Sequence, residues 1–349
     1  MNRGPSLPPY PSPNPPSCPS PLPLLFLPLA LALPLAACDT GFEDPALVKD
    51  LRVLAIKAEP PEVIFPAVAP WAVPADVPRA FDLTVLIADP GNAGRPLTCS
   101  LSTCVPDRNR RCEDPAATTR LAEGPCADGE TTFRVDIPSA VTAAAQAEDP
   151  FWRACVQAAA ADPAANCWSG LAVWIEVRVS GGERDLYALK SVVFSPELPA
   201  GRKPNANPLI TGIQLDEGAV VPPGADGVVP IAYAPGATVR MDLTRDAASK
   251  EEYALPTFEG GVRDLVEYLS IQFLSDAGSF SQFSRTDRPD NPFAADPDLV
   301  EPAEMWSKWT APAAGETGAG RPVRFWFVMS DGRGGVSWIR AVGTPAPAP

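Results

Sequence analysis

Residues 171–179 read Leu-Ala-Val-Trp-Ile-Glu-Val-Arg-Val and form the most regular alternation in the chain. Apolar side chains at every second position share one face of a β-strand, so this stretch predicts a strand with one buried face. Gly181-Gly182 supplies a turn, and residues 186–194 provide a return strand. The stretch therefore predicts a β-hairpin.

Period-two segments recur along the sequence, and turn-forming residues separate them. We predict strands at residues 51–58, 81–87, 133–137, 209–215, 238–244, 268–274, 323–329 and 336–342. The strand at 81–87 is expected to be half-buried. The 45 prolines suit a β-rich chain because proline interrupts helices, and the proline-rich stretch 60–78 predicts an edge strand or a loop. Only residues 139–147 and 150–161 predict helices, with Ser139 and Asp149 as N-caps. The pattern favours antiparallel β-sandwiches.

The carboxyl-terminal region carries a recognisable motif. It consists of Trp306-x-x-Trp309-Thr310-Ala311-Pro312, a glycine-containing loop, and residues 324–335, which read RFWFVMSDGRGG. This motif resembles the last two strands of bacterial immunoglobulin-like domains of the PKD and cadherin-like kind, which serve as spacers or adhesive modules. With the strand pattern, the resemblance implies an all-β fold class: two tandem immunoglobulin-like antiparallel β-sandwiches, the first with a small helical disulfide-rich insert. Trp306 and Trp309 differ in parity, so one should face the core and the other is a weak interface candidate.

The amino-terminal segment predicts export. Residues 22–35 form an apolar run that is long enough for the core of a signal peptide and too short to span a bilayer. The run ends in Leu35-Ala36-Ala37-Cys38, which resembles the bacterial lipobox. The resemblance implies that residues 1–37 are a lipoprotein signal peptide and that Cys38 becomes the lipidated first residue, with acyl chains such as palmitate. An ordinary secretory signal, with Cys38 uninvolved, is the alternative.

A lipid anchor of this kind implies a location in the cell envelope, on the periplasmic face or at the cell surface. Several acyl chains, at about 0.8 kcal/mol per buried methylene, are sufficient for stable attachment. The sequence leaves open the choice between inner and outer membrane. It also leaves open the true start codon, because residues 1–21 carry a single cation, Arg3.

The mature chain divides by composition. We predict a tether at 38–49, a first β-sandwich domain at 50–195 with a cysteine-rich helical insert at about 99–168, a linker at 196–208, a second immunoglobulin-like domain at 209–343 and a disordered tail at 344–349. The linker is expected to be stiff because prolines recur along it.

Six cysteines lie within the predicted insert: Cys99, Cys104, Cys112, Cys126, Cys155 and Cys167. An even number of cysteines in an exported chain predicts disulfides. The sequence does not decide the pairing, and our expectation is that sequence neighbours pair, as Cys99–Cys104, Cys112–Cys126 and Cys155–Cys167. A thiolate metal site is the alternative, but the spacing is loose and the chain has no histidine to complete it.

Composition and motifs exclude several kinds of chemistry. Histidine is absent, which removes Ser-His-Asp triads, Cys-His dyads and HExxH zinc sites. The formal charge of −14 has the wrong sign for nucleic-acid binding, and neither a P-loop nor GxGxxG is present for a nucleotide. The acidic stretch from Asp287 to Glu304 is a candidate Ca²⁺ loop, but it lacks EF-hand spacing, and a solvated charged loop is the preferred interpretation.

The sequence therefore favours a lipid-anchored, non-enzymatic envelope protein whose β-sandwiches bind a protein or a glycan. No catalytic residue, metal or cofactor is expected, and no nucleic acid or nucleotide is expected as a partner. A structural spacer or envelope assembly factor without a ligand is the first alternative. A carbohydrate-active hydrolase that uses a carboxylate pair is the second, although no pair among the 42 acidic residues stands out.

Overall fold

The structure is a computed structural model of the whole chain. It describes residues 44–67, 72–92, 94–104, 111–114, 116, 118–161, 170–256, 262–287, 305–316 and 320–346. All of these belong to one compact unit, Glu43–Pro349. No helix within the described ranges is long and apolar enough to cross a membrane.

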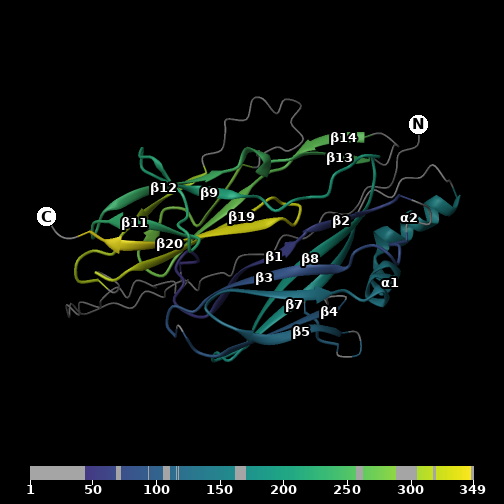
Figure 1. Cartoon of the computed structure of the whole chain (residues 1–349), viewed down its shortest axis with the longest axis horizontal. Helices are drawn as coiled ribbons and strands as arrows, with labels where there is room; N and C mark the ends of the chain where they lie inside the picture. The colour runs from purple at the N-terminus through teal and green to yellow at the C-terminus, as the bar shows by residue number, and fades with distance from the viewer. Residues whose placement is uncertain are drawn as a thin grey trace, which may run out of the picture. The chain divides into compact units, whose positions relative to one another are not determined.

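The first sandwich contains the hairpin whose first strand was predicted at 171–179. Its strands are β1 (Arg52–Glu59), β2 (Glu62–Phe65), β3 (Ala80–Ala88), β4 (Leu97–Cys104), β5 (Thr119–Cys126), β6 (Gly129–Asp136), β7 (Leu171–Ser180) and β8 (Leu186–Pro196). They form a three-stranded sheet, β1-β3-β6, and a five-stranded sheet, β2-β8-β7-β4-β5. The predicted hairpin is β7 and β8 (Figure 1). The proline-rich stretch supplies the edge strand β2, as predicted.

The second sandwich contains the remaining strands. They are β9 (Ile210–Leu215), β10 (Val220–Val221), β11 (Val228–Tyr233), β12 (Thr238–Arg245), β13 (Glu252–Pro256), β14 (Val262–Val266), β15 (Ser270–Ser275), β16 (Ser279–Phe280), β17 (Ser284–Thr286), β18 (Trp306–Thr310), β19 (Val323–Ser330) and β20 (Val336–Pro345). Its sheets are β10-β9-β12-β18-β16 and β11-β20-β19-β15-β17. Strands β13 and β14 form a separate two-stranded ribbon, and the 3₁₀ turn Ala247–Ser249 precedes it.

The two sandwiches share one topology. In the sheet β2-β8-β7-β4-β5, the hairpin that ends the first sandwich, β7 and β8, lies between the edge strand β2 and the pair β4 and β5. In the sheet β11-β20-β19-β15-β17, the final hairpin β19 and β20 lies in the same way between β11 and the pair β15 and β17. The predicted fold class, two tandem immunoglobulin-like β-sandwiches, is confirmed. The sheets are antiparallel except at one pairing in each sandwich, β2 with β8 and β11 with β20, which is parallel.

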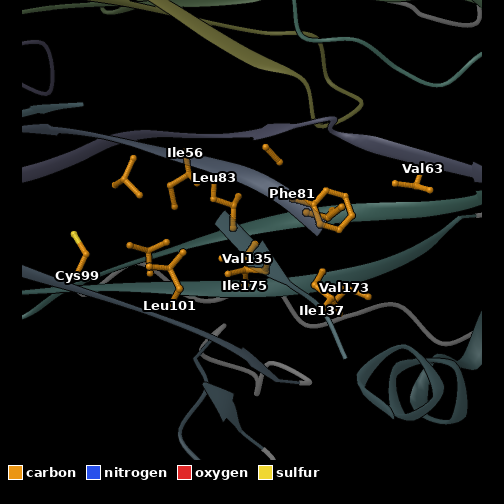
Figure 2. Close-up of a cluster of buried hydrophobic side chains, with 14 of the residues drawn as sticks. Ile56, Val63, Phe81, Leu83, Cys99, Leu101, Val135, Ile137, Val173 and Ile175 are labelled. Carbon is orange, nitrogen blue, oxygen red and sulfur yellow. The ribbon is translucent and has the colours of Figure 1, made fainter. Parts of the chain in front are cut away.

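The first core lies between the two sheets of its sandwich. Figure 2 shows Phe81 and Leu83 from β3 facing Leu101 from β4 and Ile175 from β7. Each of these side chains is fully buried. The alternation that predicted the hairpin thus places its apolar residues inside, as the period of a pleated strand requires.

The second core is built around Trp309. Its indole is fully buried, and its Nε1 donates a hydrogen bond to the carbonyl of Ala277 at 3.0 Å. The rings of Phe325 and Tyr233 meet it edge to face, with centroids 4.8 and 5.1 Å away. Trp306, three residues earlier on β18, is only half-buried. The predicted difference in parity between the two tryptophans is confirmed.

The two helices form at the predicted residues, but strands β4, β5 and β6, which fall within the predicted insert at about 99–168, belong to the sheets of the first sandwich. Helices α1 (Ser139–Glu148) and α2 (Pro150–Ala161) lie together at one end of the first sandwich (Figure 1). The carboxylate of Asp149 accepts a hydrogen bond from the amide of Trp152 at 2.8 Å, as predicted for an N-cap. The prediction for Ser139 was wrong: Pro138 occupies the N-cap position, and Ser139 is the first residue of α1.

The disulfide pairing differs from the prediction. The structure pairs Cys99 with Cys126 and Cys104 with Cys112. Cys99 and Cys104 cannot pair, because they lie on one strand, β4, about 17 Å apart at ~3.3 Å per residue. The antiparallel pairing of β4 with β5 instead brings Cys99 opposite Gly124, two residues from Cys126. The predicted Cys155–Cys167 bridge lies outside the described side chains.

Candidate functional site

An apolar cluster joins the two sandwiches. Leu86 and Ala88 project from the outer face of β3, and Leu274, Trp326 and Val328 come from the outer face of the β11-β20-β19-β15-β17 sheet. All five side chains are buried. Strand β3 is therefore buried on both faces, and the prediction of a half-buried strand was wrong. The second face is covered by the neighbouring sandwich, which period-two patterning does not reveal.

The predicted tether is packed where the structure describes it. Ala46 belongs to the second core, Val48 to the apolar cluster between the sandwiches, and Leu51 to the first core. The amide of Val48 donates a hydrogen bond to the carbonyl of Ser275 at 2.8 Å. The chain from Asp44 onward is therefore part of the folded body. This corrects residues 44–49 of the predicted tether at 38–49, whereas residues 38–43 lie outside the described residues.

We call the region where the two sandwiches meet the junction. Arg333 is the centre of a buried ionic cluster there. Its guanidinium nitrogens lie 3.1 Å from Glu62, 2.7 Å from Glu267 and 3.4 Å from Glu251. The guanidinium also stacks over the ring of Tyr253 at 4.3 Å. Glu62 belongs to the first sandwich and the other residues to the second, so this one arginine connects the two.

Glu62 is satisfied on both carboxylate oxygens although its side chain is only 4% exposed. It accepts hydrogen bonds from the Ser195 hydroxyl at 2.6 Å and from the Asn205 amide at 2.7 Å, and it also pairs with Arg202. A buried carboxylate is tolerated when it is paired and hydrogen-bonded in this way. This explains why a charged residue lies in the otherwise apolar edge strand β2.

The loop between β19 and β20 holds Arg333 in place. Asp331 is 1% exposed and accepts hydrogen bonds from the amides of Arg333 at 2.7 Å and Gly335 at 2.9 Å. Its other oxygen accepts a hydrogen bond from the Asn205 side chain at 2.8 Å. A Cβ at Gly335 would lie 2.0 Å from Asp331. The Asp-Gly-Arg-Gly-Gly run, which suggested a family resemblance, therefore has a structural role at the junction.

Lys190 contributes from an unusual position. It has the inward parity of its neighbours on β8, yet its ammonium group donates a hydrogen bond to the carbonyl of Gly334 in the second sandwich. Burial lowers its pKa to about 8. Burial also raises the pKa values of Glu251 and Glu267. The junction thus holds charged groups in a poorly solvated environment, where ion pairs and hydrogen bonds between them offset the cost of burying their charges.

The predicted linker is packed against both sandwiches. The side-chain amide nitrogen of Asn207 donates hydrogen bonds to the carbonyl of Ala58 at 2.8 Å and to Glu59 at 2.7 Å. The Asn207 amide oxygen accepts a hydrogen bond from the amide of Val336 at 2.8 Å. The segment 196–208 therefore fastens the two sandwiches together as well as connecting them.

A groove of about 750 Å³ opens beside the ionic cluster. It lies between the linker and the β13–β14 ribbon, and Arg202, Lys203, Lys250, Tyr253 and Arg333 are among the residues that line it. A second hollow of about 460 Å³ lies between α1 and the strands β4 and β7. Within the described ranges, no group of three or more cysteine, aspartate or glutamate side chains is arranged to hold a metal ion.

The structure describes only part of the predicted site. The lipobox residues Leu35, Ala36, Ala37 and Cys38 lie outside the described residues, as does the acidic stretch apart from Asp287, which pairs with Lys250 at 2.8 Å. The disulfides at Cys99 and Cys104 are described above. The junction was missed by sequence reasoning, because Glu62 and Arg333 are too far apart in sequence for any local pattern to connect them.

Comparisons with known proteins give no family. No protein-family model matches the chain, and no curated protein matches it. Solved structures that match include the periplasmic chaperone SfaE (10% identity, TM-score 0.21, 84% of this chain and 100% of that chain) and the two tandem V-type regions of VCBP3, a v-region-containing chitin binding protein (14%, TM-score 0.23, 84% and 100%). A chimeric titin Z1Z2 tandem also matches (8%, TM-score 0.19, 77% and 92%). TM-scores this low carry no argument about function.

Proposed function

We propose that the protein is a lipid-anchored, non-enzymatic component of a bacterial cell envelope that presents two joined sandwiches as one rigid body to a protein or glycan partner. The observation that carries this proposal is the junction, where Glu62 of one sandwich and Arg333 of the other share a buried ion pair at 3.1 Å. A spacer requires only a flexible connection between its domains. A fixed relation between sandwiches is instead what a composite binding surface requires.

The remaining parts of the proposal rest on the sequence. The lipobox-like run at 35–38 supports a lipid anchor, and the two disulfides suit an oxidising compartment. The absence of histidine from all 349 residues supports a non-enzymatic role. The residues around Trp309 and Asp331 support assigning the second sandwich to the PKD and cadherin-like kind.

The folded body also begins close to the proposed anchor. Five residues, 39–43, lie between Cys38 and Asp44, where the described fold begins. The six steps along the chain from Cys38 to Asp44 span at most about 20 Å when the chain is extended. We therefore propose that the sandwiches are held near the membrane surface rather than displayed at a distance from it.

Replacing Cys38 by alanine tests the anchor. We expect the wild-type protein to sediment with membranes and the Cys38→Ala protein to move almost entirely to the soluble fraction, because the acyl chains provide its attachment. Fractionation of cells that express each form, followed by immunoblotting, measures this. Cys18→Ala is the matched control, since Cys18 lies in the segment that is removed, and it should leave the distribution unchanged. Membrane association that survives Cys38→Ala would contradict the lipid anchor.

A further inference from the structure

Three cations converge on one tryptophan at the surface of the second sandwich. The guanidinium carbons of Arg240 on β12 and Arg285 on β17 lie 4.5 and 5.4 Å from the ring centroid of Trp306. The ammonium nitrogen of Lys308, on the same strand as Trp306, lies 6.0 Å from that centroid. Arg285 also donates a hydrogen bond to the Trp306 carbonyl at 3.2 Å. The group, which we call the Trp306 cluster, thus draws residues from both sheets of the sandwich.

Two of these cations occupy an unfavourable arrangement. Arg240 and Lys308 stand directly opposite each other in the pairing of β12 with β18. Like charges in this position destabilise a sheet. Asp242 offsets Arg240 through an ion pair at 3.0 Å, and Asp216 accepts a hydrogen bond from the Arg240 backbone amide. Within the described part of the chain, Lys308 makes no ion pair.

The cluster also contains buried donors without partners. Neither the indole Nε1 of Trp306 nor the Nε of Arg240 has a hydrogen-bond acceptor among the described residues, although both atoms are buried. An unsatisfied buried donor costs stability. Sites where a sequence violates several local rules at once are commonly functional. The opposed like charges beside one partly exposed aromatic ring indicate a surface that an anionic ligand completes.

We propose that the Trp306 cluster binds an acidic polysaccharide. This deepens the proposed function, on which it rests, by naming the partner class and the surface. Carboxylate or sulfate groups of the polymer would pair with Arg240, Arg285 and Lys308, since guanidinium groups match such anions in charge and geometry. The partly exposed indole offers an apolar surface to the sugar ring. The hydroxyls of Thr238 and Thr310, which lie 3.1 Å apart on the same face, offer hydrogen bonds to sugar hydroxyls.

Charge complementarity favours this class of ligand. The chain as a whole carries a charge of −14, so an acidic polymer is repelled by the protein except where cations gather. An acidic peptide would satisfy the cations equally well. It would make less use of the partly exposed indole and of the Thr238–Thr310 hydroxyl pair, which lies farther along the same face.

Binding of polygalacturonate to the membrane-extracted full chain tests the proposal. We expect wild-type protein to bind polygalacturonate, to bind neutral dextran at least tenfold more weakly, and to lose affinity as salt rises. Lys308→Gln and Arg240→Gln should each weaken binding of polygalacturonate about tenfold, which corresponds to about 1.4 kcal/mol. Arg134→Gln, which removes an exposed cation from the first sandwich, is the matched control and should bind as the wild type does.

Three outcomes would overturn the proposal: no binding of polygalacturonate by the wild type, equal weakening by Arg134→Gln, or equal binding of polyglutamate, which would show that the surface recognises charge alone. Folding is checked by the thermal midpoint of Lys308→Gln without ligand. That midpoint should equal or exceed the wild-type value, because the variant removes the opposed like charges. The proposed envelope role is tested separately by Cys38→Ala, so either idea can fail while the other stands.

Discussion

Replacing Arg333 by methionine is expected to lower the free energy of unfolding by about 3–5 kcal/mol, the cost of removing one partner from a buried ionic cluster. The substitution leaves Glu267, whose side chain is 1% exposed, without its ion-pair partner. Glu62 retains Arg202 and therefore keeps part of its compensation. Denaturant titration with a fluorescence readout measures the change.

The effect of Arg333→Met should come from uncompensated charge rather than from lost packing. Adding Glu267→Gln to Arg333→Met should therefore recover part of the lost stability, because the second substitution removes the unpaired carboxylate. Arg134→Met is the control: Arg134 pairs with Asp82 at 3.0 Å, but their side chains are 64% and 50% exposed. Exposed pairs contribute about 0–1 kcal/mol. If Arg333→Met costs no more than Arg134→Met, the junction does not stabilise the fold.

Replacing Lys190 by methionine is expected to change how stability depends on pH. The folded-state pKa of Lys190, about 8, lies below its ordinary value of 10.5. As the pH falls from 10.5 toward 8, the unfolded chain takes up this proton before the folded chain does, so the wild type loses stability across that range. Below pH 8 both states are protonated and the contribution is constant. The full loss is about 3 kcal/mol.

The free energy of unfolding, measured between pH 8 and 10.5, should therefore rise more steeply for the wild type than for Lys190→Met, by about 3 kcal/mol over the range. Lys190→Arg provides a second comparison, because arginine stays charged throughout this range. The Lys190→Arg variant should also lack the extra rise in stability with pH, because its side chain does not lose a proton in this range. Since it keeps a buried charge at every pH, its free energy of unfolding at pH 10 should be lower than that of the wild type. Parallel pH profiles for the wild type and both variants would show that Lys190 is not buried at the junction.

Much of the fold follows from sequence periodicity, and the failures have physical causes. Residues 171–179 predict their hairpin because both faces of β7 differ clearly in polarity. Strand β4 was assigned to an insert because it lies among the six clustered cysteines, and because Cys99 and Thr103 occupy two of its inward positions in place of large apolar residues. Two of its inward positions are thus occupied by small or polar side chains that sequence patterning does not recognise as core.

The junction is the part of the molecule that sequence reasoning could not find. Its residues come from an edge strand at Glu62, a proline-rich segment at Asn205 and a glycine-rich loop at Arg333. Each looks like an ordinary surface element when it is read locally. The single local signal was Lys190, a charged residue at an inward position of a predicted strand. A lysine at such a position indicates that its ammonium group binds a polar partner outside the apolar core. Its partner lies 144 residues away, which no local period can reveal.

The central claim is that the two sandwiches behave as one body because the junction is buried. Differential scanning calorimetry of the wild-type protein with its disulfides intact tests this most directly. We expect a single unfolding transition in which the calorimetric and van't Hoff enthalpies agree. Two separate transitions would show that the sandwiches unfold independently and would contradict the account.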